Sequence, residues 1–234
     1  MSAEPVLTGI SSMATRGLLA DLAALYERQT RQRVAIESVG GVEAAKRVES
    51  GEAFDVVVLA SDAMARLADA GHIARDSLVD VVRSSIAVAV KDGTAAPDIS
   101  SESALREAIL RAKTIGYSTG PSGAHVLKLL ERWGIAPREP RVVQAKPGVP
   151  VGSLIADGNV EIGFQQLSEL MHVEGIAMLG TLPSSIASVT VFSAAITTTC
   201  PNRDVAAAFL AFIASDQAAS LARRHGMESV SAKP

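Results

Sequence analysis

The sequence is short of cysteine, and this shortage excludes two kinds of site. Cys200 is the single cysteine of the chain, so an internal disulfide and a cysteine metal cluster are both impossible. The histidines do not have the spacing of metal ligands: they are His72, His125, His172 and His225. We therefore expect no metal and no other cofactor.

Aromatic residues and an excess of one charge are also lacking. Aromatic side chains are 3% of the residues, which argues against a binding site built on stacked bases or sugar rings. Lysine and arginine number 22 against 25 aspartates and glutamates, and the net charge is −3 with no basic run. Nucleic acid and a charged membrane surface are therefore not expected as partners. An anionic ligand would have to be held by local dipoles.

Long apolar runs are missing as well, so membrane insertion is not expected. The first residues, 1–5, lack the charged and hydrophobic parts of a secretion leader. Two alternatives account for this start. One is a cytoplasmic protein, and the other is a mature secreted form whose leader has been replaced by a start methionine.

What the sequence does contain is a regular alternation of apolar runs and helix-period segments. The run 54–60 is almost continuously apolar and β-branched, which is typical of a strand buried on both faces. Strands are predicted at 6–10, 33–39, 54–60, 84–90, 114–116, 141–144, 159–164 and 189–196. Helices are predicted at 18–28, 42–48, 61–70, 105–110, 126–133, 153–156, 167–170, 205–214 and 217–224, with loops at 91–101 and 137–140. This order indicates an α/β chain with a parallel, doubly wound sheet.

Residues 117–125, Tyr-Ser-Thr-Gly-Pro-Ser-Gly-Ala-His, predict a strand end, a tight turn and a helix start. Gly120 and Gly123 let the backbone approach a ligand closely, and Ser122 is expected to cap the new helix. The unpaired amides at the start of a helix carry partial positive charge, so this turn suits an anion. It is not a Walker loop, because the lysine-containing motif is absent, and an ordinary βα turn explains the same residues.

Three further strand ends carry groups that suit a ligand. In the pair Ser11–Ser12 one hydroxyl is expected to cap the first helix; either this is the pair's whole role, or the other hydroxyl faces a ligand. The pair Gly40–Gly41 suits either close backbone approach or a plain turn. The pair Gln165–Gln166 offers donors and acceptors to carboxylates, unless both residues begin a helix and face water.

In their order and spacing these motifs resemble the periplasmic solute-binding proteins of the molybdate-binding type, an ABC transporter substrate-binding family. The resemblance covers nearly the whole chain and rests on residues 9–13, 40–41, 54–61, 120–123 and 162–170. The last stretch, Ile-Gly-Phe-Gln-Gln-Leu-Ser-Glu-Leu, is similar to a branch of the family that includes aconitate isomerase. That branch implies a small organic acid in place of molybdate.

The resemblance implies a type II periplasmic-binding-protein-like fold of two α/β lobes, each a mainly parallel sheet with flanking helices. Lobe 1 would comprise residues 1–83 and 193–234, lobe 2 residues 84–192, and two crossover strands would join them. A ligand would be closed in a cleft between the lobes by a hinge motion. The resemblance also implies a periplasmic location, in a mature form lacking its leader, with a cytoplasmic one as the alternative. A transporter component would have a membrane permease as partner.

Two functions of different class remain open. The first is a solute-binding protein that sequesters a small anion, preferably a di- or tricarboxylate and otherwise an oxyanion of the molybdate or tungstate type. Ligand contacts are expected from Ser11, Ser12, Gly40, Gly41, Tyr117, Ser118, Ser122, Gly123, Gln165 and Gln166. Arg16, one turn into the first helix, is preferably an exposed arginine, and the alternative is that it reaches the ligand.

The second function is an aconitate isomerase on the same fold, which would interconvert the cis and trans forms by a cofactor-free proton transfer. Such chemistry needs a base for a carbon-bound proton and a group that stabilises the carbanion-like state. His125 is the preferred base because it lies three residues after Ser122, and Tyr117 would donate or relay the proton. A surface or core-edge histidine and a packing tyrosine are the alternatives, and His172 is a weaker candidate. A serine hydrolase is not expected, because no Gly-x-Ser-x-Gly elbow is present.

Overall fold

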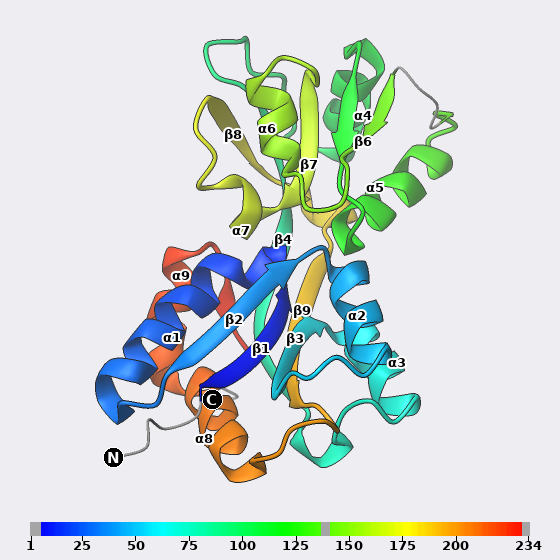
Figure 1. Cartoon of the computed structure of the whole chain (residues 1–234). Helices are drawn as coiled ribbons and strands as arrows, with labels where there is room; N and C mark the ends of the chain where they lie inside the picture. Colours follow the sequence, from blue (N-terminus) through cyan, green and yellow to red (C-terminus); the bar gives the residue numbers. More distant parts are fainter. Residues whose placement is uncertain (1–5, 137–140, 231–234) are drawn as a thin grey trace. The chain divides into compact units, whose positions relative to one another are not determined.

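The computed structural model describes residues 6–136 and 141–230 and divides the chain into two compact units (Figure 1). Unit 1 consists of the chain up to Arg83 together with the segment from Val191 onward, and unit 2 runs from Ser84 to Thr190. Strands β4 (Val79–Lys91) and β9 (Val189–Ile196) contribute to both units, because the boundaries fall within them. The start at residues 1–5 and the predicted loop 137–140 lie outside the described residues.

The sheet of unit 1 is mixed. Strands β1 (Leu7–Ser12), β2 (Val34–Val39) and β3 (Val56–Ala60) are parallel, in the order β2-β1-β3, and β9 pairs with β3 in the antiparallel sense. Strand β4 follows β9, and the two-residue strand β10 (Glu228–Ser229) pairs with β4. Within the described residues β2 has one strand neighbour, so it forms an edge of this sheet.

Helices cover both faces of the unit 1 sheet. Helices α1 (Arg16–Thr30), α8 (Arg203–Ile213) and α9 (Asp216–Arg224) pack on the face that receives Val56 and Val58 of β3. Helices α2 (Gly41–Glu49) and α3 (Ser61–Asp69) pack on the face that receives Val57 and Leu59. All five residues of β3 are buried, which confirms the predicted strand between two layers. Two short 3₁₀ helices, η1 (Met13–Thr15) and η2 (Arg75–Ser77), complete the unit.

The sheet of unit 2 has the order β4-β7-β5-β6. Strands β5 (Ile115–Tyr117), β6 (Val142–Gln144) and β7 (Ile162–Gln166) are parallel, and β7 is antiparallel to β4. Helices α4 (Glu102–Arg111) and α5 (Pro121–Arg132) supply apolar side chains to one core layer, and α6 (Val151–Ala156) and α7 (Leu167–Leu170) supply them to another. The remaining elements are β8 (Ile176–Thr181), which pairs with β4, and the 3₁₀ helix η3 (Ser184–Ile186).

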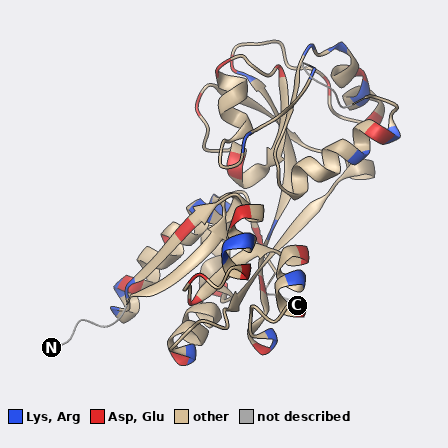
Figure 2. Cartoon of the chain, turned by 45° about the vertical axis from the view of Figure 1, so that its right-hand side comes forward, with Lys and Arg blue, Asp and Glu red and all other residues tan. Residues whose placement is uncertain are grey.

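The structure confirms the predicted alternation and adds three features to it. Strand β4 begins at Val79, five residues before the predicted start, and neither β8 nor β10 was expected from the sequence. Acidic and basic residues are interspersed along the helices and loops rather than separated by sign (Figure 2). In the described part of the chain no single helix is long and apolar enough to cross a membrane. Only α8 and α9 taken together, bent by 61°, reach that length and composition.

Candidate functional site

The expected ligand residues of unit 1 lie together at the carboxyl ends of β1 and β2. Ser11 and Ser12 are the last residues of β1, and the fully buried Ser11 Oγ lies 2.8 Å from Ser38 Oγ on β2. Ser12 Oγ is also buried, but it has no hydrogen-bond partner within the described residues. A buried polar group left unpaired costs about 1–3 kcal/mol, so this hydroxyl is a candidate for contact with a ligand. We call Ser11, Ser12, Ser38, Gly40 and Gly41 the unit 1 cluster.

The glycine pair of this cluster begins helix α2. Gly40 has φ −57° and ψ 135°, a conformation open to any residue. A Cβ on Gly41 would lie 3.6 Å from Ser12 Cβ, which is an ordinary contact, so Gly41 is next to Ser12 without being sterically required. The N-cap residue, Gly40, has no side chain with which to cap the first amides of α2. These N–H donors carry partial positive charge, and Gly41, the first residue of the helix, lies next to Ser12.

In unit 2 the glycine-rich turn is built around a pair of serines. Ser118 Oγ lies 2.8 Å from Ser122 Oγ and accepts a hydrogen bond from the Gly120 amide at 3.3 Å. Gly123 is required by packing, because a Cβ there would lie 1.7 Å from the Ser118 carbonyl oxygen. Helix α5 begins at Pro121, so its N-cap is Gly120 and the prediction that Ser122 caps it is wrong. The fixed φ of proline suits the first helical position, which places Ser122 inside the helix.

Gln165 and Gln166 are the last two residues of β7 and point to opposite faces of the sheet. Both are buried, so the alternative in which they face water is wrong. Gln165 is fully engaged: its Oε1 accepts from the Val151 amide at 2.7 Å and its Nε2 donates to Glu169 at 2.7 Å. Gln166 Nε2 donates to Thr190 Oγ1 at 2.7 Å, and Gln166 Oε1 is buried with no partner in the described chain.

A rotation of the Gln166 amide changes what it offers. The nitrogen and oxygen exchange places on a half turn, and the Thr190 hydroxyl can accept from one or donate to the other. The end left unpaired is an acceptor in one orientation and a donor in the other. Gln166 can therefore donate a hydrogen bond to a carboxylate of a ligand or accept one from a hydroxyl of a ligand. Ser168 Oγ, two residues later, is another buried atom without a partner in the described residues.

Glu169 is the polar group of this region that the sequence did not single out. It is the third residue of α7, half-buried, and accepts hydrogen bonds from Gln165 Nε2 and from the backbone of Gln166. The backbone contact is half of a capping box, which gives Glu169 a structural reason to be there. Burial raises the pKa of this carboxyl to about 7, against a smaller lowering by the two hydrogen bonds. We call Ser118, Ser122, Gln165, Gln166 and Glu169 the unit 2 cluster.

The two residues expected to transfer a proton lie next to the turn. Tyr117, the last residue of β5, is half-buried and packs against a core layer of unit 2, and its hydroxyl makes no hydrogen bond within the described residues. Its ring lies against Gly123, since a Cβ there would be 3.0 Å from Tyr117 Cδ2. His125 Nε2 lies 3.0 Å from the Ile186 carbonyl oxygen, to which it must donate, so Nδ1 is the nitrogen left to act as a base. His172 is exposed in the turn after α7.

Comparison with known families decides to which group the chain belongs. Residues 7–228 match the model of the bacterial extracellular solute-binding protein family. The chain belongs to this family. An aconitate isomerase from Pseudomonas sp. is 33% identical over 242 residues, which cover 100% of this chain and 92% of that protein.

Solved structures show the same fold for this member of the family. The periplasmic molybdate-binding protein of Azotobacter vinelandii matches with a TM-score of 0.78 and 18% identity, over 97% of this chain and 99% of that one. The tungstate ABC transporter protein of Geobacter sulfurreducens matches with a TM-score of 0.75 and 16% identity, over 94% and 98% of the two chains. These likenesses confirm the predicted type II periplasmic-binding-protein fold.

The polar groups of the two clusters are mainly hydroxyls and amides rather than the side chains that hold a metal ion. No group of three or more histidine, cysteine, aspartate or glutamate residues able to hold a metal ion occurs among residues 6–136 and 141–230. Both clusters instead combine hydroxyls and amides with the N-termini of helices. Donors of this kind bind carboxylates and tetrahedral oxyanions without a full positive charge.

Proposed function

We propose that the protein binds a small organic acid, of the di- or tricarboxylate class, as its solute. The observation that carries this proposal is the buried, unpaired hydroxyl of Ser12 beside the uncapped N-terminus of α2. A carboxylate oxygen placed there would accept from the hydroxyl and from the helix amides. In unit 2 the free end of Gln166 is a polar group that suits the same class of ligand.

Calorimetric titration of the purified protein tests this proposal. The ligands are citrate, cis-aconitate, trans-aconitate and malate, with molybdate, tungstate and sulfate as oxyanions. We expect binding of at least one carboxylate and a loss of affinity of about tenfold in Ser12→Ala, because the variant lacks one hydrogen bond to a charged group. Ser220→Ala, an exposed serine of α9, is the control. Binding of molybdate or tungstate alone would assign the oxyanion instead, and binding of no anion would contradict the proposal.

A second candidate is isomerisation of aconitate on the same fold, and the 33% identical aconitate isomerase favours it. The reaction removes a proton from a carbon of the substrate and returns it to another position through a carbanion-like state. Three groups of unit 2 are suited to move that proton: His125 through Nδ1, the unpaired hydroxyl of Tyr117, and Glu169. A base that titrates near neutral pH is the most effective one at that pH, and the raised pKa of Glu169 meets this condition.

Proton NMR separates the two candidates. Trans-aconitate is incubated with the protein and with a boiled sample, and the cis signals are followed. Growth of the cis form with the native protein alone would establish an isomerase, and Tyr117→Phe, His125→Gln and Glu169→Gln would then be compared. Broadened substrate signals without product would leave the protein a binder.

We also propose that the protein acts outside the cytoplasm and delivers its ligand to a membrane permease. The description of its family as extracellular and the ABC transporters among its structural relatives support this. Fractionation of the host cells with an antibody against the protein tests the location. Recovery in the periplasmic or extracellular fraction is expected, and recovery with the cytoplasm would contradict it.

A further inference from the structure

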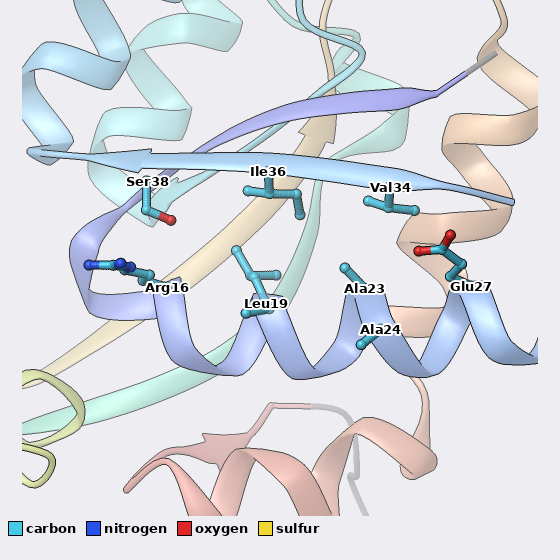
Figure 3. A pocket seen from close by; sticks show the side chains of 9 residues that line it. Arg16, Leu19, Ala23, Ala24, Glu27, Val34, Ile36 and Ser38 are labelled. Atoms are coloured by element: carbon cyan, nitrogen blue, oxygen red, sulfur yellow. The ribbon is translucent and has the colours of Figure 1, made fainter.

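A groove of about 590 Å³ runs between helix α1 and strand β2 of unit 1 (Figure 3). Between its ends the groove is lined by the apolar residues Leu19, Ala20, Ala23, Ala24, Val34 and Ile36. Charged residues of opposite sign lie at its two ends: Arg16, near Ser38, at one end and Glu27, near Val34, at the other (Figure 3). The anion clusters do not use this groove, apart from Ser38.

The groove lies along an unpaired sheet edge. Within the described residues β2 has β1 as its one neighbour, and the Leu7 amide donates to the Arg33 carbonyl at 2.9 Å. Because backbone groups alternate in direction along a strand, Val34, Ile36 and Ser38 turn their N–H and C=O groups away from β1. The same three residues line the groove. β2 has neither proline nor lysine, the usual protections of a free edge.

We propose that this face, α1 with the edge of β2, pairs with the same face of a second copy of the chain about a twofold axis. A twofold axis makes the two β2 strands antiparallel, so the Ser38 end of one meets the Val34 end of the other. Arg16 of each copy then faces Glu27 of the other. Opposite charges at the two ends make the groove complementary to itself, and no other partner has to be assumed.

The register follows from the backbone directions. With Ile36 on the axis, Val34 lies opposite Ser38 of the second copy, and the outward groups form about six hydrogen bonds. On the other face of the sheet the same register sets Glu37 opposite Ala35, so no like charges meet. Ala20 and Ala24 are exposed on α1, and their small side chains let the two helices approach closely.

Sedimentation equilibrium with charge-swapped variants tests the pairing. We expect a reversible dimer of the wild type. Arg16→Glu or Glu27→Arg alone should raise the dissociation constant by about tenfold or more. Each dimer has two contacts between residues 16 and 27, and in either variant both change from opposite charges to like charges. Within the described residues Arg16 makes no hydrogen bond or ion pair, whereas Glu27 lies 3.9 Å from Arg33. The Arg16 variant therefore changes the dimer contact without removing an ion pair inside the monomer. The double variant Arg16→Glu with Glu27→Arg should restore the dimer.

Arg28→Glu, an exposed residue of α1 that does not line the groove, is the matched control and should leave the dissociation constant unchanged. Hydrogen exchange by NMR gives a second readout. The amides of Val34, Ile36 and Ser38 should gain protection as the protein concentration rises, whereas those of Ala35 and Glu37, directed to β1, should not change. A monomer up to the solubility limit, a dimer insensitive to both single variants, or a double variant that stays weak would each overturn the proposal.

Discussion

At the scale of single residues, Glu169 is a carboxyl group whose charged form the fold disfavours. Its pKa is raised from 4.5 to about 7 by burial, so the folded protein holds this proton more tightly than the unfolded chain does. The free energy of unfolding should therefore fall as the pH rises from about 4.5 to about 7, and level off above that. The difference between these two values corresponds to roughly 3 kcal/mol.

Urea unfolding of Glu169→Gln at several pH values measures this effect. The variant should match the wild type at pH 5 and exceed its stability at pH 8 by roughly 2 kcal/mol, because the glutamine carries no charge to bury. Glu174→Gln, an exposed glutamate in the turn that follows, should keep the wild-type profile. Equal slopes for the wild type and Glu169→Gln would show that this carboxyl is not the group responsible.

Gly123 and Gly120 provide a second comparison at this scale, within a single turn. A Cβ at Gly123 would lie 1.7 Å from the Ser118 carbonyl oxygen, whereas a Cβ at Gly120 has its nearest neighbour at 3.8 Å. Gly123→Ala should lower the free energy of unfolding by about 2–3 kcal/mol, since the turn must move to admit the methyl group. Gly120→Ala, with φ −88°, should cost less, about 0.5–1 kcal/mol, because alanine is a poorer N-cap than glycine. Denaturant unfolding measures the free energy of unfolding of both variants, and equal values would refute this account of the turn.

At the scale of the elements, Gln165 connects the start of α6, the end of β7 and the helix α7. Its two hydrogen bonds join the Val151 amide to Glu169. Gln165→Leu should lower the free energy of unfolding by about 2–4 kcal/mol, because two partners lose their bonds in a buried place. Gln166→Leu loses one bond, to Thr190, and removes the end that is free for a ligand. It should affect ligand affinity more than stability. Denaturant unfolding measures the stability of both variants, and calorimetric titration measures their ligand affinity. A larger loss of affinity in Gln165→Leu, with a larger loss of stability in Gln166→Leu, would contradict the assignment.

The elements also show what the sequence could predict and why. A continuous apolar run such as β3 is expected in the middle of a sheet with helices packed on both faces, and the structure confirms this position. β8 was missed because half of its six residues are exposed and it contains Gly180, so no periodic pattern identifies it. The position of Gln165 and Gln166 at the end of a predicted strand indicated that both contact a ligand. Their separate roles depend on Val151 and Thr190, which are distant in sequence and meet them only in the fold. The raised pKa of Glu169 had no sequence signal for the same reason.

At the scale of the whole molecule, two units are formed by a chain that passes between them in β4 and β9. The sequence motifs predicted this class of fold because each strand end carried its hydroxyl or glycine in the family's order. The choice between binder and isomerase is not encoded in that order. It depends on which proton-transfer groups reach the ligand, and a ligand held by the two clusters together stays a prediction.

Hydrogen exchange with and without a bound tricarboxylate tests that last prediction. A ligand that bonds the α2 amides and Ser12 should slow exchange at Gly41 and Val42, and one that bonds the turn of unit 2 should slow it at Gly123. A single ligand held by both clusters should protect the two regions in proportion, at one saturation point. It should also stabilise the protein by about 2.7 kcal/mol at a hundredfold excess over the dissociation constant. In Ser12→Ala the protection of both regions should shift to higher ligand concentration together. Protection confined to one unit, or two regions that saturate separately, would mean that the clusters bind independently.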